Sequence, residues 1–412
     1  MWTGLTVSLL GDGIFFVAIA WQTYRLSNVP TALALVGFSW SLPMVLFVLV
    51  GGVMSDRFDR RWVLVTADAI RGVSLTLMGL LAITGTMELW HLVALAAVFG
   101  VGQAFFGPAI GAIVPDIVPK HLLVEANSLD NFVRPMAERL VGPALGGFIV
   151  AVGAPDTGAG LAFLIDAGTF AISAIAVLNM APIPKQAGGP GTRSLIREIR
   201  EGVSFVRGQT WLWATLVSAA FSLLFAIGPF EVLIPFVVKN QLGGGSNDLG
   251  LVFAAGGVGA IVAALVMGQR GLPRLHITVM YLSWGTGIAL MIGFAVAEVP
   301  WHAMVVNGVI WALFTIGMIV WMTLMHRLVP SRVLGRVSSL DWMTSLVLVP
   351  LSFALTGPLS EAIGVNTVLI GGGILGGIAT FLFLFVPGVR DTERSGALAL
   401  TEPDEDKEEL SV

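Results

Sequence analysis

Residues 31–61 read TALALVGFSWSLPMVLFVLVGGVMSDRFDRR, an apolar run followed at once by a short charged turn. The run carries no charged residue from 31 to 54, and an α-helix needs about 20 apolar residues to cross the hydrocarbon core of a bilayer. The charges from Asp56 to Arg61 mark the place where the chain leaves the membrane. This stretch therefore predicts a membrane-spanning helix that ends in a tight turn.

The same pattern extends over the whole chain of 412 residues, of which 56 % are hydrophobic and 12 % charged, with a mean hydropathy of +0.89. A soluble globular protein carries about 25 % charged residues, so this composition excludes a disordered chain and argues against a water-soluble enzyme. The absence of cysteine excludes disulfides, thiolate nucleophiles and Cys-ligated metals. A net charge of −4 provides no basic field for nucleic acid. We expect a polytopic membrane protein in the lipid bilayer that is not an enzyme.

Apolar segments long enough to span a membrane recur along the chain, and they predict an all-α fold of twelve transmembrane helices. We place these helices at 3–25, 31–54, 62–86, 90–114, 126–152, 159–181, 211–238, 248–269, 277–297, 301–326, 337–361 and 365–388. They are too long for the strands of a membrane β-barrel, which alternate over about ten residues. The segment at 3–25 lacks a basic leader and a small-residue cleavage site, so we interpret it as a retained helix.

The positions of Lys and Arg predict the orientation, because cytoplasmic loops are enriched in these residues. With a cytoplasmic N-terminus, only Arg25 and Lys239 among the 22 Lys and Arg residues fall in outer loops. Arg71, Arg134 and Arg139 lie inside spans, and all the others lie on the cytoplasmic side. We therefore expect a bacterial inner-membrane protein with both termini in the cytoplasm.

The longest loop, from Pro182 to Gln209, lies near the middle of the chain. Its second part, SLIREIREGVSFVRG (194–208), has apolar residues at helical spacing opposite Arg and Glu. This pattern predicts an amphipathic helix on the inner membrane surface, or a solvated linker helix. We divide the chain into a six-helix bundle (1–181), this linker (182–210), a second six-helix bundle (211–388) and an acidic cytoplasmic tail (389–412).

The two halves resemble each other in sequence. VPKHLLVEANSLD (118–130) aligns with VPSRVLGRVSSLD (329–341), and VMSDRFDRR (53–61) aligns with VMGQRGLPR (266–274), at nearly the same offset. Such a repeat predicts two bundles related by pseudo-two-fold symmetry, with the working site between them near the bilayer midplane.

The turn at 51–61 resembles the signature loop of the major facilitator superfamily. The resemblance implies the twelve-helix, two-bundle fold of that family, in which the matching Asp packs against the start of helix 11 and gates the cytoplasmic side. The gating residues carried over are Gly52, Asp56, Arg57, Arg60 and Arg61. The second copy of the loop has Gln269 in place of Asp56, so we expect this latch in the first half only. The plainer alternative is an ordinary positive-inside loop.

The fifth span contains GPALGG, which resembles the antiporter motif that separates exporters from importers in this superfamily; its residues are Gly142, Pro143, Gly146 and Gly147. With SLLGDG (8–13), PDIVP (115–119) and LGR (334–336), it resembles the drug:proton antiporter-3 branch, which includes macrolide, tetracycline and siderophore exporters. Related antiporters carry an Arg in helix 4 three residues before a Gln-Gly pair. Here Gly100 precedes Gln103, so this arginine is missing. Generic packing of small residues is the alternative reading of the fifth span.

Charged residues inside the spans are candidates for function, because a charge at mid-bilayer costs at least ~2.5–3.5 kcal/mol. Asp12 and Glu231 have no oppositely charged partner in their own spans, and desolvation favours the protonated form of such a carboxyl group. We expect these two residues to be the proton sites. Glu138 is a third candidate, although Arg134 and Arg139 beside it allow a structural charge pair instead.

Two further charged positions predict structure rather than transport. Asp68 and Arg71 are three residues apart on one helix, which suits an ion pair. By the resemblance, the third and sixth spans are peripheral, so we expect this pair and Asp166 to be structural.

Large aromatic and Met side chains accommodate bulky amphipathic molecules. By the resemblance, spans 1, 5 and 7 border a central cavity. The predicted lining is Phe16, Trp21, Gln103, Phe106, Asn131, Arg134, Arg139, Phe225, Phe230, Asn307, Trp311, Phe314, Met318 and Trp342. Some of these aromatic residues could instead face lipid or neighbouring helices.

The sequence predicts a monomeric, proton-coupled exporter of bulky amphipathic compounds that works by rocking of the two bundles. The chain has no GxxxxGK[ST] phosphate loop, and its His residues lack metal-ligand spacing, so we expect no cofactor and a proton gradient as the energy source. The alternatives are export of a siderophore or other endogenous metabolite, translocation of a lipid or lysolipid, and uncoupled facilitated transport.

Overall fold

A computed structural model describes residues 2–118, 122, 129–130, 132–153, 157–180 and 195–394, without the side chains at 56, 112, 114–116, 195–199, 331 and 332. Helices make up 88 % of the structure, and its described part contains no strand. Twelve helical segments in this part are long and apolar enough to cross a membrane, which confirms the predicted fold class. The start of the predicted linker and the acidic end of the tail lie outside the described residues.

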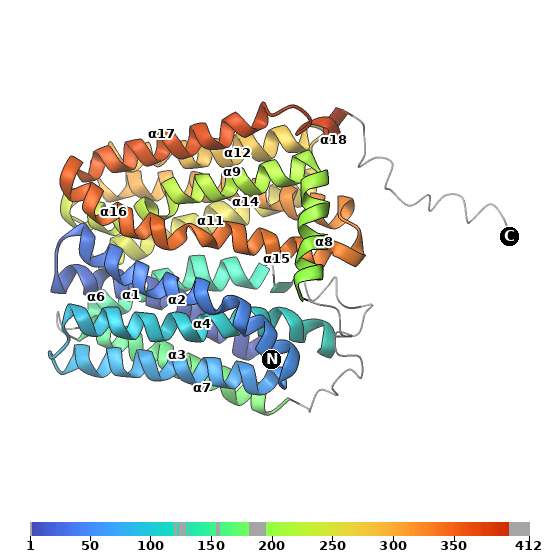
Figure 1. Ribbon diagram of the computed structural model, residues 1–412. Coiled ribbons are helices and arrows are strands. Elements are labelled where there is room, and N and C mark those ends of the chain that lie inside the picture. Colours follow the sequence, from blue (N-terminus) through green and yellow to red (C-terminus); the bar gives the residue numbers. More distant parts are fainter. Residues whose placement is uncertain are drawn as a thin grey trace.

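The helices form two halves that lie side by side (Figure 1). The first half contains α1 (Trp2–Leu26), α2 (Pro30–Arg57), α3 (Arg60–Ile83), α4 (Leu89–Ile117), the π-helical turn η2 (Pro135–Val141), α6 (Gly142–Val152) and α7 (Gly158–Leu178). The second contains α9 (Thr210–Gly228), η3 (Pro229–Leu233), α10 (Ile234–Phe236), η4 (Val237–Gln241), α11 (Ser246–Arg270), α12 (His276–Ala289), α13 (Ile292–Ala295), α14 (Pro300–Leu328), α15 (Ser331–Val347), α16 (Val349–Ile363) and α17 (Val365–Leu384). The helix α8 (Leu195–Gly208) precedes the second half, and α18 (Asp391–Arg394) follows it.

Proline interrupts the seventh and eleventh spans, which the sequence predicts as continuous helices. The seventh changes to π-helical geometry at Pro229 and reaches Gln241 through α10, and the eleventh breaks at Leu348, two residues before Pro350. Proline has no backbone N–H and its ring crowds the preceding turn, so it removes a bond from the regular ladder of helical hydrogen bonds. Regular α-helical geometry is therefore interrupted within both spans.

The two halves meet along two pairs of helices, α2 with α16 and α6 with α11. Small residues allow the second contact: a Cβ atom added at Gly147 would lie only 2.9 Å from the Cα atom of Gly250 and 2.6 Å from the carbonyl oxygen of Ser246. Helices in lipid associate by this kind of close backbone packing. The antiporter-like motif therefore lies at the contact between the halves.

Hydrogen bonds between the halves gather at the end of the molecule opposite α8, which we call the far end. There the Tyr24 hydroxyl group donates to the carbonyl oxygen of Val232 (2.7 Å), and the Asn28 and Asn240 side chains bond to each other (2.7 Å). Lys239 also donates to the carbonyl oxygen of Tyr24 (2.5 Å). These contacts close the far end of the interface.

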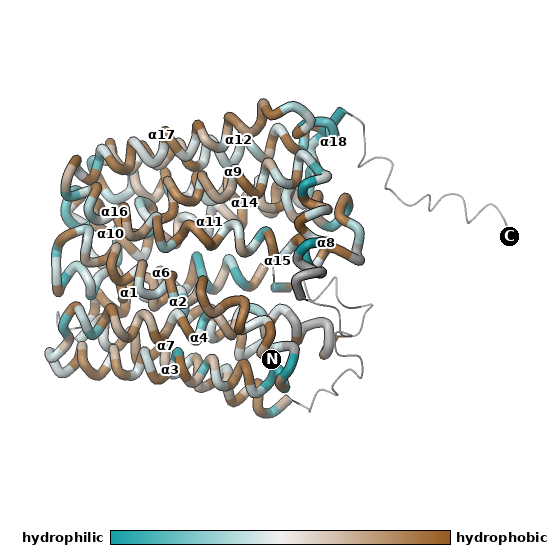
Figure 2. The backbone as a smooth tube through the Cα atoms, in the orientation of Figure 1, coloured by the Kyte–Doolittle hydropathy of each residue, from teal (hydrophilic) through white to brown (hydrophobic). Residues whose placement is uncertain are grey.

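The amphipathic helix predicted at 194–208 is present as α8, and it crosses the end of the second half (Figure 1). Its Glu201 forms an ion pair with Arg336 of α15 (2.6 Å), and its Val206 is buried among residues of the second half. The helix is therefore docked onto the bundle. Figure 2 shows the apolar residues spread along the spans and hydrophilic residues at α8 and α18.

Candidate functional site

A central cavity of about 330 Å³ lies between the halves and is lined mainly by apolar side chains. The first half contributes Phe16, Glu138, Arg139 and Pro143. The second half contributes Leu223, Ala226, Ile227, Phe230, Glu231, Phe253, Gly287, Ile288, Met291, Ile310, Trp311, Phe314 and Met318. A pocket of this size and composition suits a small molecule of largely apolar character.

Aromatic rings from η3 and α14 form one wall of the cavity. The ring of Trp311 makes an edge contact with Phe230, with centroids 6.1 Å apart, and lies 5.8 Å from the Phe314 ring. The guanidinium group of Arg139 sits over the face of Trp311, with its Cζ atom 3.5 Å from the ring centroid. A cation over an aromatic face is attracted by the electron-rich ring, more strongly where water is excluded. The Trp311 face therefore offers a binding surface for positive charge, which Arg139 occupies.

Acidic side chains accompany Arg139 in the same cavity. Glu231 interacts electrostatically with Arg139 and with Glu138, so two carboxyl groups share one guanidinium group. In the described residues no ion pair joins Glu138 to Arg134 or Arg139; Arg134 instead lies 3.5 Å from Asp130. Glu138 therefore interacts with Arg139 electrostatically but forms no direct ion pair with it in the described residues.

Glu231 also lies at the boundary between two cavities. With Phe16 and Phe253 it lines both the central cavity and a second cavity of about 50 Å³. The smaller cavity extends toward the far end, between Leu33 and Pro235. Glu231 therefore borders both of these spaces.

The three charged residues of the cavity sit on π-helical turns. Glu138 and Arg139 belong to η2, and Glu231 belongs to η3. Each turn starts at a proline, Pro135 or Pro229, whose missing N–H group permits the wider backbone. Such turns often mark functional positions. These two prolines are the feature of the sequence that could indicate the positions of the turns.

The cavity wall includes part of the lining predicted from the sequence. Among the predicted lining residues, those in the wall are Phe16, Arg139, Phe230, Trp311, Phe314 and Met318. Sequence reasoning missed the aliphatic members of the wall, such as Leu223 and Ile310, and also Phe253. No sequence signal distinguishes an aliphatic side chain that lines a cavity from one that faces a neighbouring helix.

Other predicted lining residues lie elsewhere, which corrects those predictions. Asn307 is fully buried between α14 and α11, where its amide donates to the carbonyl oxygen of Val252 (2.7 Å). The side chain of Gln103 accepts a hydrogen bond from Arg71 (3.0 Å), and the Phe106 ring lies under the same guanidinium group. Each of these residues packs inside its own half rather than between the halves.

The remaining predicted lining residues also lie outside the wall. The Trp21 ring lies 5.6 Å from the ammonium group of Lys239, Phe225 packs toward α17, and Trp342 is 67 % exposed on the molecular surface. Arg134 belongs to the contact with Asp130 described above. Asn131 lies outside the described residues.

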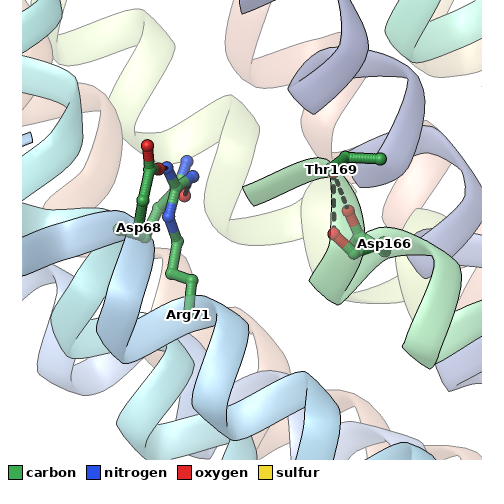
Figure 3. Close-up of polar contacts among 5 residues, drawn as sticks. Asp68, Arg71, Asp166 and Thr169 are labelled. Carbon is green, nitrogen blue, oxygen red and sulfur yellow. Dashed lines mark hydrogen bonds and ion pairs between the residues drawn. The ribbon is translucent and has the colours of Figure 1, made fainter. Parts of the chain in front are cut away.

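Asp12 lies in α1 and is absent from the cavity wall. Its charged neighbours are Arg71, Glu138, Asp68 and Arg134. The ion pair expected between Asp68 and Arg71 is present and completely buried (Figure 3). The guanidinium group of Arg71 lies between two rings, with its Cζ atom 3.9 Å from the centroid of Phe106 and 4.2 Å from that of Phe170.

The structure also places the two motifs. Gly142 meets Gly13 of α1, and Gly146 packs against the backbone of Ile14, so the antiporter-like motif holds α6 against α1 as well as α11. The side chain of Asp56 lies outside the described part, as does any latch that it forms, while Gly52 has open space around it and Arg57 is exposed. Arg60 begins α3, and Arg61 donates to the carbonyl oxygen of Leu178 (3.2 Å).

The chain is similar to known membrane proteins in both sequence and fold. A family model described as transmembrane secretion effector matches residues 1–408. The chain is 24 % identical over 374 residues to macrolide efflux protein A of Streptococcus pyogenes, covering 89 % of this chain and 90 % of that protein. It is 26 % identical over 399 residues to the multidrug efflux pump Tap of Mycolicibacterium fortuitum, covering 92 % and 89 %. Its fold is similar to the inward-open xylose transporter XylE of E. coli, with a TM-score of 0.68, 13 % identity and coverage of 97 % and 99 %.

Proposed function

This chain belongs to the transmembrane secretion effectors of the major facilitator superfamily, and from that premise we propose that it is a proton-coupled exporter of bulky amphipathic compounds. It is a multi-pass membrane protein and a transporter by family and fold. The names of its relatives, a macrolide efflux protein and a multidrug efflux pump, support drugs as cargo.

The observation that carries the proposal is the composition of the central cavity. Its wall is aromatic and aliphatic, with charge limited to Glu138, Arg139 and Glu231. A sugar would need many hydrogen-bonding side chains, whereas a bulky amphipathic molecule needs apolar contact area and one or two polar anchors. The flexible side chains of Met291 and Met318 add adaptable surface for molecules of different shape.

The position of Glu231 supports proton coupling. Glu231 interacts electrostatically with Arg139 in the wall of the cavity. Displacement of Arg139 by cargo would therefore change the affinity of Glu231 for a proton. Because Glu231 borders both cavities, rocking of the halves would expose it to one side of the membrane and then to the other.

We also propose how the protein is oriented in the membrane. With the termini in the cytoplasm, the far end faces outward, and its hydrogen bonds hold the exporter closed to the outside. Rocking would break these contacts and bring the α8 ends of the two halves together. Asp12 and Glu231 are the proposed proton carriers, with Glu138 between them as a third candidate.

The test uses everted vesicles that contain the purified protein and have an acidic interior. A macrolide antibiotic should accumulate inside, and Glu231→Gln should abolish accumulation while the exposed control Glu298→Gln leaves it unchanged. A siderophore and a lysolipid tested in parallel examine the other cargo classes. Macrolide accumulation that is equal with and without the pH gradient would contradict proton coupling.

A further inference from the structure

Asp166 of α7 is a completely buried carboxyl group that the proposed transport cycle does not use. Its Oδ2 atom is buried and has no hydrogen-bond partner in the described structure. Its other oxygen contacts the Thr169 hydroxyl group on the same helix (Figure 3). An ionised carboxylate left so poorly solvated is costly, whereas the neutral acid is not. The surroundings of Asp166 therefore favour its protonated form.

The Thr169 hydroxyl group contacts two oxygen atoms of Asp166 at once. Its Oγ1 atom lies 2.7 Å from the backbone carbonyl oxygen of Asp166 and 2.9 Å from Oδ1 of the same residue. A hydroxyl group has one hydrogen to donate, and a carbonyl oxygen can only accept. The hydroxyl group donates to either acceptor but can satisfy only one of them fully at a time. The carboxyl group of Asp166 therefore receives at most one shared, neutral hydrogen bond from Thr169, which is weak solvation for a full negative charge.

The carboxyl group of Asp166 lies directly against α1, at Gly11. A Cβ atom added at Gly11 would overlap Oδ1 of Asp166 and Oγ1 of Thr169, so a glycine is required for this contact. Asp12 follows Gly11 in the chain, and its charge acts on Asp166. Two buried carboxyl groups that interact electrostatically resist ionising together, and such a pair commonly holds one proton.

The positive charge in this region is too small to neutralise all of its carboxyl groups. Arg71 donates through one nitrogen to Gln103 of α4 (3.0 Å) and through another to Asp68 of α3, so these two hydrogen bonds do not reach Asp166. The charged groups that act on Asp12 are Arg71, Asp68, Glu138 and Arg134. Those that act on Asp166 are Asp12 and Arg71. One buried guanidinium group therefore stands among Asp12, Asp68 and Asp166, and an excess of buried negative charge is strongly unfavourable.

We propose that Asp12 of α1 and Asp166 of α7 together hold one proton in a site enclosed by the first half, apart from the substrate cavity. Asp12 is the partly exposed member of the pair, and it interacts with Glu138 in the cavity wall. Asp12 therefore interacts electrostatically both with Glu138 in the cavity wall and with Asp166. The site binds its proton whether or not the protein exports drugs; only its use in coupling rests on the function proposed above.

Infrared difference spectroscopy of the purified, lipid-embedded protein tests the site without any substrate. A protonated carboxyl group gives a C=O stretching band distinct from that of a carboxylate. Wild type at neutral pH should show such a band, and Asp166→Asn should remove a component of it that Glu231→Gln leaves in place. The exposed control Glu88→Gln should leave it intact. A band that survives in Asp166→Asn and disappears in Asp12→Asn would overturn the proposal, because Asp12 alone would then carry the proton.

A second variant keeps the test decisive if Asp166→Asn does not fold. Thr169→Val preserves the volume of the side chain and removes the hydroxyl group that contacts Oδ1. The band should persist in this variant at a shifted frequency, because hydrogen bonding changes the C=O stretch of Asp166. An unshifted band would refute the assignment. Absence of any band in wild type would also refute it, and neither result depends on whether a drug, a siderophore or a lipid is the cargo.

Discussion

Removal of Arg71 should be the most damaging single change in the first half. Its side chain and that of Asp68 are both fully buried and form an ion pair. Breaking a buried pair by deleting one partner leaves the other charge uncompensated, at a cost of about 3–5 kcal/mol. The contacts with the rings of Phe106 and Phe170, at 3.9 and 4.2 Å, are lost at the same time. We expect Arg71→Met to lower the free energy of unfolding by about 3–5 kcal/mol.

Removal of the partner should cost less. In Asp68→Asn, Arg71 keeps its bond to Gln103 and its two aromatic faces, and the Asp12–Asp166 pair can release its proton to supply a compensating charge. The double variant Asp68→Asn/Arg71→Met carries neither charge of the pair. It should therefore be more stable than the sum of the single effects implies, with a coupling energy of about 1–3 kcal/mol.

The measurement is reversible unfolding in mixed micelles, followed for wild type, both single variants and the double variant. Glu88→Gln serves as the control for loss of an exposed carboxylate. Single effects that add within about 0.5 kcal/mol would show that the two side chains do not interact energetically. Equal losses of unfolding free energy in Asp68→Asn and Arg71→Met would contradict the idea that the Asp12–Asp166 pair releases a proton to replace the missing negative charge.

Three further variants examine other parts of the molecule. Glu393 caps α12 by accepting hydrogen bonds from the backbone N–H and hydroxyl groups of Thr278 (2.5 and 3.0 Å). Glu393→Ala should therefore lower the free energy of unfolding by about 1 kcal/mol in the same assay, and no change would contradict the cap. Gly147→Val should prevent the close approach of α6 and α11 and abolish transport in vesicles, whereas normal transport would show that the contact can open without cost. Asn28→Ala should remove the side-chain hydrogen bond to Asn240 and shift the population toward an open far end. Distances between spin labels on introduced cysteines would measure this shift, since the chain has no cysteine of its own, and an unchanged distribution would refute the effect.

The membrane spans could be predicted from the sequence because their signal is local. The run at 31–54 became α2, and the charged turn that follows it ends that helix. The helix interruptions at Pro229 and Pro350 depend on more than the local sequence. A transmembrane helix tolerates proline when neighbouring groups satisfy the freed backbone, so the outcome depends on packing that the sequence does not state.

The candidate site was harder to predict because it depends on how each helix is rotated about its axis. Asn307 was expected in the cavity as a polar residue, but its amide bonds to α11 instead. Asp166 was expected to be structural because its span is peripheral by the resemblance. The structure places it against Gly11, and the sequence alone does not indicate which face of α1 that glycine occupies.

The missing arginine of helix 4 illustrates why a motif and its chemistry are separable. Related antiporters carry a guanidinium group three residues before a glutamine, and this chain has Gly100 there. In the structure, Arg71 of α3 donates to Gln103 of α4, so a guanidinium group reaches that glutamine from a neighbouring helix. What the chemistry requires is a positive charge at this place among the carboxyl groups. Under the proposals above, Arg71 fixes one carboxylate, and its single charge leaves the Asp12–Asp166 pair to be neutralised by a proton.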